Sequence, residues 1–369
     1  MTDVAIVGGG VTGLSIAFAL QQRGAEVVVL ERTGVAAGQS GVQPGGIRQQ
    51  WGTPVACRLA RESVSWWRSA EDRLESPVRL NLRLCGYLFV AHSEPTLARL
   101  AANVEVQNAE GVPSRLVSPA EAADLVPGLL VDELAGASWC GEDGYFDRPQ
   151  AVVEAIARHV DVRIAEVSAL APADAGWLLS GPFGHQEARA VVVATGVDTN
   201  CLLGQLGASL PIEPEERHLF LSEPLRERLL EPLVVAPELR FAAKQLGDGR
   251  VLASDLAAVG DPGEGTPRWR AAVREGIRRL VPVLEYVDFS VLVSGSYDVT
   301  PDRQPVLGAV PEHDGLHVAA GFSGHGFMIA PAVGRIVAAA VAGEHDDVLD
   351  VLDARRFSEG RLVPEPQVV

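Results

Sequence analysis

The sequence predicts an α/β fold in which a parallel nucleotide-binding sheet is interleaved with a second, α+β part that contains a mainly antiparallel sheet. Residues 3–7 and 27–31 are apolar runs, which are typical of buried parallel strands. A glycine-rich turn and an apolar helix lie between them. Two strand-rich insertions then interrupt the chain. We therefore assign residues 1–80, 145–210 and 295–369 to a nucleotide-binding domain, and residues 81–144 and 211–294 to a substrate-binding domain.

The turn after residues 3–7 fits the Rossmann-type fingerprint GxGxxG through Gly8, Gly10 and Gly13. Gly8 permits the tight turn, Gly10 lets the backbone approach a pyrophosphate, and Gly13 allows close packing of helix on strand. Glu31 ends the second strand, where a carboxylate accepts from ribose hydroxyls and disfavours a 2′-phosphate. The fingerprint therefore indicates FAD or NAD rather than NADP, without choosing between the first two.

Composition limits the class of protein. A chain of 369 residues with 47% hydrophobic content suits about two globular domains. Its net charge of −17 opposes nucleic-acid binding. The chain has no apolar run of the ~18 residues that span a membrane and no leader pattern, so we expect a cytoplasmic protein. The four cysteines form no CxxC pair, which argues against a metal site or a disulfide framework.

The remaining elements are predicted from glycine and proline positions, helix caps and hydrophobic periodicity. We expect a helix before the second strand, a long functional loop at 34–52, and a helix at 53–75. In the first insertion we expect strands at 82–91 and 135–140 and a helix at 94–110. A helix that Asp147 caps should run to His159, and strands should follow at 162–167 and 189–195. Residues 211–293 should form strands, with a hairpin at 247–249 and a helix at 269–280. The chain should finish with a strand at 316–320, a loop at 321–326 and a helix at 331–342.

Motifs spread along the whole chain carry a resemblance to a known family. They are residues 7–13, 41–51, 143–145, 194–196, 297–308, 321–327 and 330–331. In this order they resemble the D-amino-acid oxidase superfamily, in the branch of sarcosine oxidase, dimethylglycine dehydrogenase and glycine oxidase. The resemblance implies FAD rather than NAD, bound in an extended form with its flavin ring at the domain interface. The first of the two domains is then an FAD-binding domain.

We expect the cofactor to contact the glycine-rich turn, the loop after the second strand, the later strand ends and the 321–328 segment. The residues are Gly8, Gly10, Val11, Thr12, Gly13, Glu31, Arg32, Ser40, Gly46, Ile47, Val167, Thr195, Gly196, Gly321, Ser323, Gly324, His325, Gly326, Phe327 and Met328.

Arg48 is the best candidate for binding a substrate carboxylate, because it matches the sarcosine oxidase arginine by resemblance and its guanidinium fork suits that group. Tyr297 and His325 should line the same site. Where sarcosine oxidase has a second carboxylate-binding lysine, this chain has Met328, and Tyr297 replaces a glycine oxidase arginine. These departures indicate a larger or more apolar substrate.

Two further features concern the flavin and its reoxidation. Gly295 stands where monomeric sarcosine oxidase has its flavin-tethering cysteine, and residues 38–46 contain no histidine, so we expect noncovalent FAD. Lys244 is the only lysine, and so the only candidate for the lysine that promotes reaction with O₂ in sarcosine oxidases. A solvated strand lysine is the favoured interpretation of that residue.

The leading hypothesis is an FAD-dependent amine oxidoreductase that acts on an amino acid or N-alkyl amino acid by hydride transfer to flavin N5, after which the imine is hydrolysed. The electron acceptor is O₂ or another molecule. One alternative is a 2-hydroxy-acid oxidoreductase, which would need His325 as a base. Another is a flavoprotein subunit of a larger dehydrogenase, so a partner subunit or a homo-oligomer stays open. A NAD-binding module is the weakest alternative.

Overall fold

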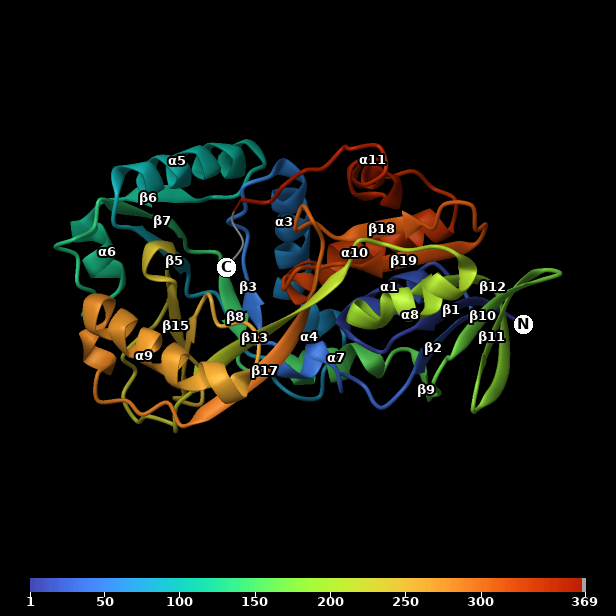
Figure 1. Cartoon of the computed structure of the whole chain (residues 1–369), viewed down its shortest axis with the longest axis horizontal. Coiled ribbons are helices and arrows are strands. Elements are labelled where there is room, and N and C mark those ends of the chain that lie inside the picture. Colours follow the sequence, from blue (N-terminus) through green and yellow to red (C-terminus); the bar gives the residue numbers. More distant parts are fainter. Residues whose placement is uncertain (367–369) are drawn as a thin grey trace.

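The computed structural model describes residues 1–366, and its two lobes are each built on one large sheet (Figure 1). The first sheet has the order β10-β11-β12-β1-β2-β9, with β19 beside β12 and β18 beside β19. The pairs β1·β2, β1·β12, β2·β9 and β12·β19 are parallel. Its strands are β1 (Thr2–Val7), β2 (Val27–Glu31), β9 (Asp161–Ile164), β10 (Ala169–Ala173), β11 (Gly176–Gly181), β12 (Gly184–Val193), β18 (Val306–Ala309) and β19 (Leu316–Ala320).

The second sheet has the order β17-β13-β16-β15-β14-β5-β7-β6 and is antiparallel except for the pair β14·β5. It draws on two separate stretches of chain, so the two sheets alternate along the sequence. The predicted α/β fold with a mainly antiparallel second sheet is therefore confirmed. The strands are β5 (Tyr87–Ala91), β6 (Arg115–Val117), β7 (Gly136–Cys140), β13 (Glu213–Leu221), β14 (Leu233–Ala236), β15 (Phe241–Gln245), β16 (Val251–Asp255) and β17 (Val291–Val299).

A third, three-stranded sheet joins the long loop after β2 to the 143–145 motif and to residues 82–83. Its order is β3 (Gly46–Ile47), β8 (Gly144–Phe146) and β4 (Leu82–Arg83). Figure 1 shows β3 and β8 between the two lobes. Arg48, the predicted carboxylate-binding arginine, directly follows β3, so this small sheet fixes the position of its backbone.

Helices cover both sheets, and α10 packs against both α1 and α3. Pro331 lies inside α10 and supplies no N–H, yet the helix continues because α3 compensates. Trp67 donates its indole N–H to the carbonyl of Met328, and the Ser63 hydroxyl accepts from the amide of Ala332. The helices are α1 (Val11–Gln22), α2 (Gln39–Val42), α3 (Pro54–Arg68), α4 (Ala70–Arg73), α5 (Glu94–Ala109), α6 (Pro119–Leu125), α7 (Pro149–Ala157), α8 (Thr199–Leu203), α9 (Pro262–Leu280), α10 (Gly326–Val341) and α11 (Asp347–Leu352).

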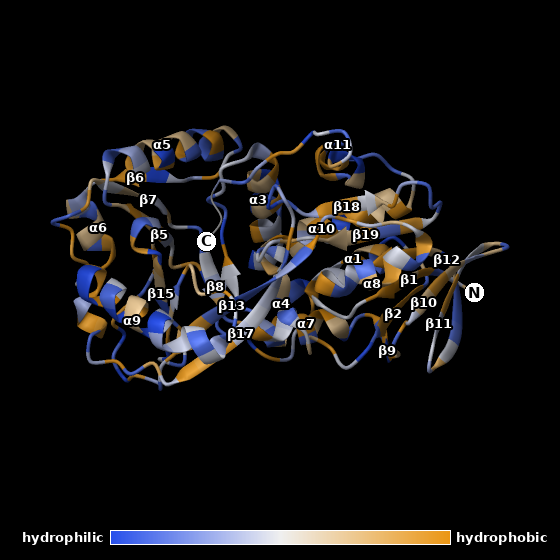
Figure 2. Ribbon diagram, viewed as in Figure 1, coloured by the Kyte–Doolittle hydropathy of each residue, from blue (hydrophilic) through white to orange (hydrophobic). Residues whose placement is uncertain are grey.

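Hydropathy follows this layering. The β1 and β2 strands are almost continuously hydrophobic, as expected for strands that helices cover on both faces (Figure 2). α9 alternates hydrophobic and hydrophilic residues because only one of its faces packs on the second sheet, through residues such as Trp269 and Val273.

Four local expectations were wrong. The predicted helix 53–75 is interrupted at Ser69, and the predicted strand 82–91 splits into β4 and β5, which belong to different sheets. The last long helix starts at Gly326, ahead of Pro331, for the reason given above. Asp147 does not cap α7, because its carboxylate accepts instead from Arg83 at 2.7 Å and from the amide of Gly247 at 2.8 Å. Tertiary partners decided all four.

A buried ion pair closes the C-terminal part of the fold and gives a test of its stability. Arg356 and Asp302 are both fully buried, with Nε–Oδ2 and Nη2–Oδ1 distances of 2.9 and 3.1 Å. We expect Arg356→Leu to lower the free energy of unfolding by about 3–5 kcal/mol, because Asp302 would remain buried without its cation. Urea unfolding checks this. Arg278→Leu, which removes an exposed pair with Glu275, should leave the midpoint unchanged. Equal effects of the two variants would contradict the prediction.

Candidate active site

A cavity of about 890 Å³ runs from the glycine-rich turn after β1 to the inner face of the second sheet. Gly8, Gly10 and Glu31 line one end. Arg48 and Tyr297 line the other. The volume lies within the ~300–1,000 Å³ typical of cofactor and ligand sites.

The turn at the first end has no room for side chains. Gly8 has φ +113°, and a Cβ there would lie 2.3 Å from the carbonyl oxygen of Ala194. A Cβ on Gly13 would lie 2.1 Å from the carbonyl oxygen of Gly8. The backbone of β12 and the start of α1 therefore approach this turn as closely as a pyrophosphate site requires.

Glu31 lies beside this turn with its carboxylate fixed by backbone donors. Oε2 accepts from the amide of Gly9 at 2.7 Å, and Oε1 accepts from the amide of Thr33 at 2.8 Å. Half-burial raises the pKa of Glu31, but these hydrogen bonds and one from Gly34 outweigh it and hold the pKa below its usual range. The carboxylate therefore stays ionised and oriented, as ribose binding requires.

The loop after β2 spans the cavity. The Ser40 hydroxyl accepts from the amide of Val11, the first residue of α1, at 2.9 Å. The Gln39 side chain accepts from the amide of Ser296 on β17 at 2.7 Å. This loop therefore contacts both lobes across the space that a dinucleotide would occupy.

The 321–326 loop is tied to the end of β17 by one buried carboxylate. Asp298 Oδ2 accepts from the amide of Gly321 at 2.7 Å, and the Asp298 carbonyl accepts from the amide of Ser323 at 3.1 Å. A Cβ on Gly324 would lie 2.3 Å from the ring of Tyr297. The start of α10 therefore faces the cavity beside Tyr297. The role of Asp298 in holding this loop was not foreseen from the motif in which it lies.

Most of the expected cofactor residues line this cavity. They are Gly8, Gly10, Val11, Thr12, Glu31, Arg32, Ser40, Gly46, Val167, Thr195, Gly196, Ser323, Gly324, His325, Gly326, Phe327 and Met328. Gly13, Ile47 and Gly321 lie behind its wall: Gly13 against Gly8, Ile47 within β3, and Gly321 on Asp298. The four expected catalytic residues, Arg48, Lys244, Tyr297 and His325, all line it.

Arg48 is 3% exposed and is held by aromatic rings rather than by an acid. Its guanidinium carbon lies 3.6 Å from the ring centre of Trp51 and 5.4 Å from that of Phe89. Nε and Nη1 have no hydrogen-bond partner among the described residues. Burial lowers the pKa of Arg48, and the Glu365 and Asp143 carboxylates act in the opposite direction. A buried guanidinium with free donors in a cavity is suited to a carboxylate ligand.

Two buried carboxylates hold the Arg48–Thr53 segment, one at its start and one at its end. Asp143 accepts from the amide of Gln49 at 2.7 Å and from the Gln50 side chain at 3.0 Å. Glu365, near the C-terminus, accepts from the amide of Gly52 at 2.8 Å and from the Thr53 hydroxyl at 2.7 Å. Burial raises the pKa of Asp143 to about 6. Neither role was foreseen from the sequence. Asp143 lies in the 143–145 motif, which assigns it no contact, and nothing in the sequence links Glu365 to Thr53.

His325 is buried beside Arg48 and is neutral. Its Nε2 lies 3.0 Å from the carbonyl oxygen of Arg303, which can only accept, so Nε2 carries the proton. Its ring lies 4.7 Å from that of Trp51. Burial, together with the positive charge of Arg48, lowers the pKa of His325 to about 3. His325 therefore fixes the loop and shapes the cavity without carrying charge at neutral pH.

Lys244 is 1% exposed, so the expectation of a solvated strand lysine was wrong. It lies on β15 with its side chain in the cavity wall, opposite Leu252 of β16. Nζ donates to the carbonyl of Pro44 at 2.5 Å and lies 4.4 Å from the ring centre of Tyr145. Burial lowers the pKa of Lys244 to about 7.

The rest of this wall is the inner face of the second sheet and is largely apolar, contributed by Leu219, Leu233, Val235, Ala242, Leu252 and Val293. Arg217 is a second arginine in it, unforeseen from the sequence. Its side chain pairs with Glu215 at 2.5 Å and donates to the carbonyl of Leu256 at 2.7 Å. Unlike Arg48, Arg217 is therefore already partnered.

Two features outside this cavity offer weaker sites. A groove of about 800 Å³ between α1, α3 and α10 carries five arginines, but each has a partner. The partners are Glu344 for Arg23, Glu110 for Arg58, the Glu110 carbonyl for Arg61, the Ser69 hydroxyl for Arg73 and Glu62 for Arg335.

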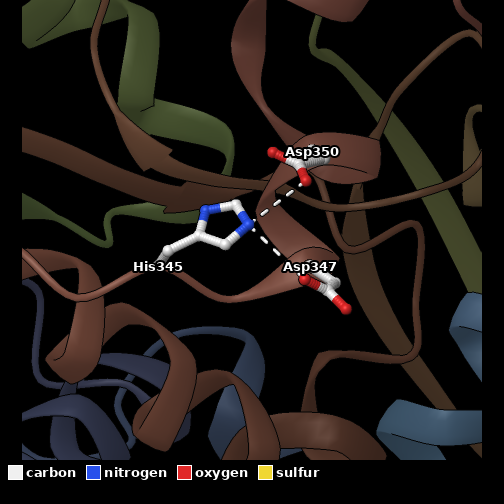
Figure 3. A group of neighbouring side chains, drawn as sticks. All are labelled: His345, Asp347 and Asp350. Carbon is white, nitrogen blue, oxygen red and sulfur yellow. Dashed lines mark ion pairs between the residues drawn. The ribbon is translucent and has the colours of Figure 1, made fainter.

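The second feature is a surface group formed by His345, Asp347 and Asp350 (Figure 3). The imidazole already pairs with both carboxylates, at 3.4 and 3.3 Å, and all three side chains are well exposed. Such a group is stable in water without a metal ion.

No helix in the described part of the chain is long and apolar enough to span a membrane.

Comparison with known proteins agrees with this geometry. Residues 3–340 match the FAD dependent oxidoreductase (DAO) family. The chain is 30% identical to "FAD-dependent oxidoreductase domain-containing protein 1" of Bos taurus, over 95% of this chain and 83% of that protein. It is 29% identical to glycine oxidase of Geobacillus kaustophilus, over 91% and 92%. The crystal structure of L-proline dehydrogenase from P. horikoshii superposes with a TM-score of 0.91 at 27% identity, over 98% and 99%.

The chain therefore belongs to the FAD-dependent oxidoreductases of the DAO family. It is an enzyme of the amino-acid and amine oxidase type, and its cofactor is FAD. The resemblance inferred from the motifs is confirmed. The packed glycine turn and the fixed Glu31 carboxylate fit the adenosine and pyrophosphate half of FAD.

The buried amine predicts a pH-dependent stability. The pKa of Lys244 is lower in the folded chain, so the unfolded chain binds more protons between about pH 7 and pH 10.5. Burial of the charged amine therefore lowers the free energy of unfolding below pH 7, and this loss disappears as pH rises through the window. We expect Lys244→Met to raise the free energy of unfolding at pH 6.5 by about 2–5 kcal/mol, from ~1.4 kcal/mol per pKa unit. The gain should shrink between pH 7 and pH 9.5, measured by urea unfolding.

Arg250→Met is the matched control for that measurement, because it removes one exposed positive charge from the same hairpin. It should change stability little at either pH. A gain for Lys244→Met that is the same at pH 6.5 and pH 9.5 would contradict a lowered Lys244 pKa.

Proposed function

We propose that this enzyme oxidises the C–N bond of a largely apolar amino acid or N-alkyl amino acid. The observation that carries the proposal is Arg48, a buried guanidinium with unpartnered donors in the wall of the FAD cavity. Bound FAD supplies a hydride acceptor for the C–H bond next to the amine. The residues of the chain supply binding, orientation and exclusion of water.

Arg48 binds the α-carboxylate in this proposal. Stacking on Trp51 and the two clamps on the Arg48–Thr53 segment fix the guanidinium in advance, so little side-chain freedom is lost when a carboxylate binds. Arg217 is less suited, because Glu215 and Leu256 already use its donors. Tyr297 and Met328 line the same space and contribute an aromatic ring and a thioether, neither of which carries a charge.

The side chain or N-substituent of the substrate lies against the apolar face of the second sheet. Leu219, Leu233 and Val293 have no charge to offer a second carboxylate. The names of similar proteins support this class: L-proline dehydrogenase and glycine oxidase act on small amino acids.

Oxidation of a 2-hydroxy acid with His325 as the base is less well supported. That reaction needs a base for the alcohol proton, and His325 was the candidate. Burial lowers the pKa of His325 to about 3, which makes it a very weak base.

Anaerobic bleaching of the flavin tests the class of substrate. The probes are glycine, sarcosine, L-proline, D-proline, L-leucine and L-lactate, each added to the holoenzyme without oxygen. We expect at least one amino acid to bleach the flavin absorbance and L-lactate to leave it unchanged. Bleaching by L-lactate alone would overturn the proposal.

Replacing Arg48 tests the carboxylate site. For the fastest probe of that panel, Arg48→Met should raise KM and lower kcat/KM by about 100-fold, because loss of one partner of a desolvated charge pair costs ~2–5 kcal/mol. Arg217→Met, the matched variant in the same cavity, should lower kcat/KM by less than about tenfold, since an already partnered arginine is not the anchor. The reverse order would assign the carboxylate to Arg217.

We also propose that the FAD is noncovalent. Gly295 carries no side chain to form a link, and Cys201, which lines the cavity, lies on α8 beside Thr195 and Gly196, among the nucleotide-binding residues. Precipitation with acid should leave the yellow colour in the supernatant. A yellow pellet would show a covalent flavin.

A further inference from the structure

The chain uses lysine once. Of its 31 basic residues other than histidine, 30 are arginine and one is Lys244. That single lysine is 1% exposed and lines the FAD cavity, whereas every exposed basic position of the chain is arginine. Arginine stays protonated in proteins, but a lysine amine can lose its proton. The one position that holds lysine is therefore a position where a side chain that can be uncharged faces the reaction space.

The surroundings of Lys244 favour the uncharged amine. No carboxylate forms an ion pair with it among residues 1–366. The titratable groups that face it are Tyr145 of β8, Cys85 before β5 and Asp147 after β8. Asp147 is occupied by Arg83 and by the amide of Gly247. Desolvation thus outweighs the attraction of these groups, and the pKa of Lys244 is lowered to about 7.

Lys244 contacts the chain just ahead of β3, the strand that Arg48 follows. Its Nζ donates to the carbonyl of Pro44, two residues before Gly46. A Cβ on Gly46 would lie 2.4 Å from the Tyr87 hydroxyl and 3.2 Å from the Met328 methyl carbon, so these side chains crowd the same point. A neutral Lys244 that donates one N–H to Pro44 keeps its lone pair for another proton.

We propose that Lys244 accepts a proton from the ammonium group of the bound substrate and so prepares the free amine for oxidation. The inference rests on the proposed amine substrate and adds a group to its site. Amino acids carry an ammonium group at neutral pH, and a nitrogen without a lone pair cannot form the C=N bond.

The step balances as follows. An N–H bond of the substrate ammonium breaks, and its proton joins the lone pair of Lys244 Nζ to form a new N–H bond. The substrate then gives the hydride of its adjacent C–H bond, with both electrons, to the flavin. The nitrogen lone pair completes the C=N bond, and water hydrolyses the product. Lys244 returns its proton to solvent before the next turnover.

Anaerobic stopped-flow bleaching from pH 5.5 to pH 9.5 tests this, with L-proline and sarcosine as probes. In the wild type the bleaching rate should fall about tenfold per pH unit below pH 7, as Lys244 becomes protonated. Lys244→Met and Lys244→Arg should both lose the bend near pH 7, so that their rates keep rising up to pH 9.5 with the fraction of free amine. At pH 8 they should bleach about 100-fold more slowly than the wild type, within the ~10²–10⁴-fold range of acid–base catalysis. Arg250→Lys, which adds an exposed lysine six positions along the chain, should behave as the wild type.

The two half-reactions separate the outcomes. Unchanged bleaching in Lys244→Met, with slower reoxidation of the reduced flavin by O₂, would overturn the proposal and assign Lys244 to oxygen. Unchanged pH profiles in both half-reactions would also overturn it. Bleaching by none of the amines would instead overturn the proposed function.

A readout without substrate uses the single lysine directly. In holoenzyme labelled with ¹⁵N-lysine, one Nζ signal should titrate with a midpoint near pH 7. Arg250→Lys should add a second signal with an ordinary midpoint near pH ~10.4. A Lys244 midpoint above pH 9 would overturn the proposal, because the amine would then stay charged.

Discussion

The site depends on two buried carboxylates that hold one six-residue segment. Asp143 binds the start of the Arg48–Thr53 segment, and Glu365 binds its end. One comes from the turn before β8 and the other from the C-terminal tail, so the segment is fixed only when both lobes and the tail are folded. Arg48 projects from it into the FAD cavity, and Trp51 from the same segment stacks on the guanidinium. The proposed carboxylate anchor is thus preorganised by hydrogen bonds from residues outside the cavity wall.

Burial acts differently on Arg48, His325 and Lys244, three of the basic side chains that line this cavity. Arg48 keeps its charge, because the ordinary pKa of arginine is too high for desolvation to reach neutrality, and aromatic faces stabilise the cation. His325 becomes neutral and serves as a fixed wall. Lys244 has its pKa lowered to about 7, where small changes of environment alter its protonation. One low-dielectric space therefore holds a permanent cation, a neutral ring and a titratable amine.

The interleaved chain makes these contacts possible. β17 forms an edge of the second sheet, yet its last residues hold the 321–326 loop that opens α10 of the first lobe. The β3-β8-β4 sheet joins the loop after β2 to the 143–145 motif in the same way. Residues that are close in sequence thus contact both lobes, and the cavity lies between the segments that pass from one lobe to the other.

The sequence by itself determined the elements whose signals are local. Buried apolar strands, the Gly8-to-Gly13 turn and the acid at Glu31 follow from patterning, and ordered motifs identified the family. It also named Arg48, Tyr297 and His325, because motif residues are recognisable without coordinates.

Only the tertiary structure decided what depends on contacts between distant residues. It put the sole lysine in the cavity rather than in solvent, because strand periodicity does not tell which face of β15 meets another lobe. It joined Glu365 to Thr53 across 312 positions and carried α10 through Pro331 with donors and acceptors from α3. Burial, pKa and partner choice are set by neighbours in space, and a linear pattern carries no record of them.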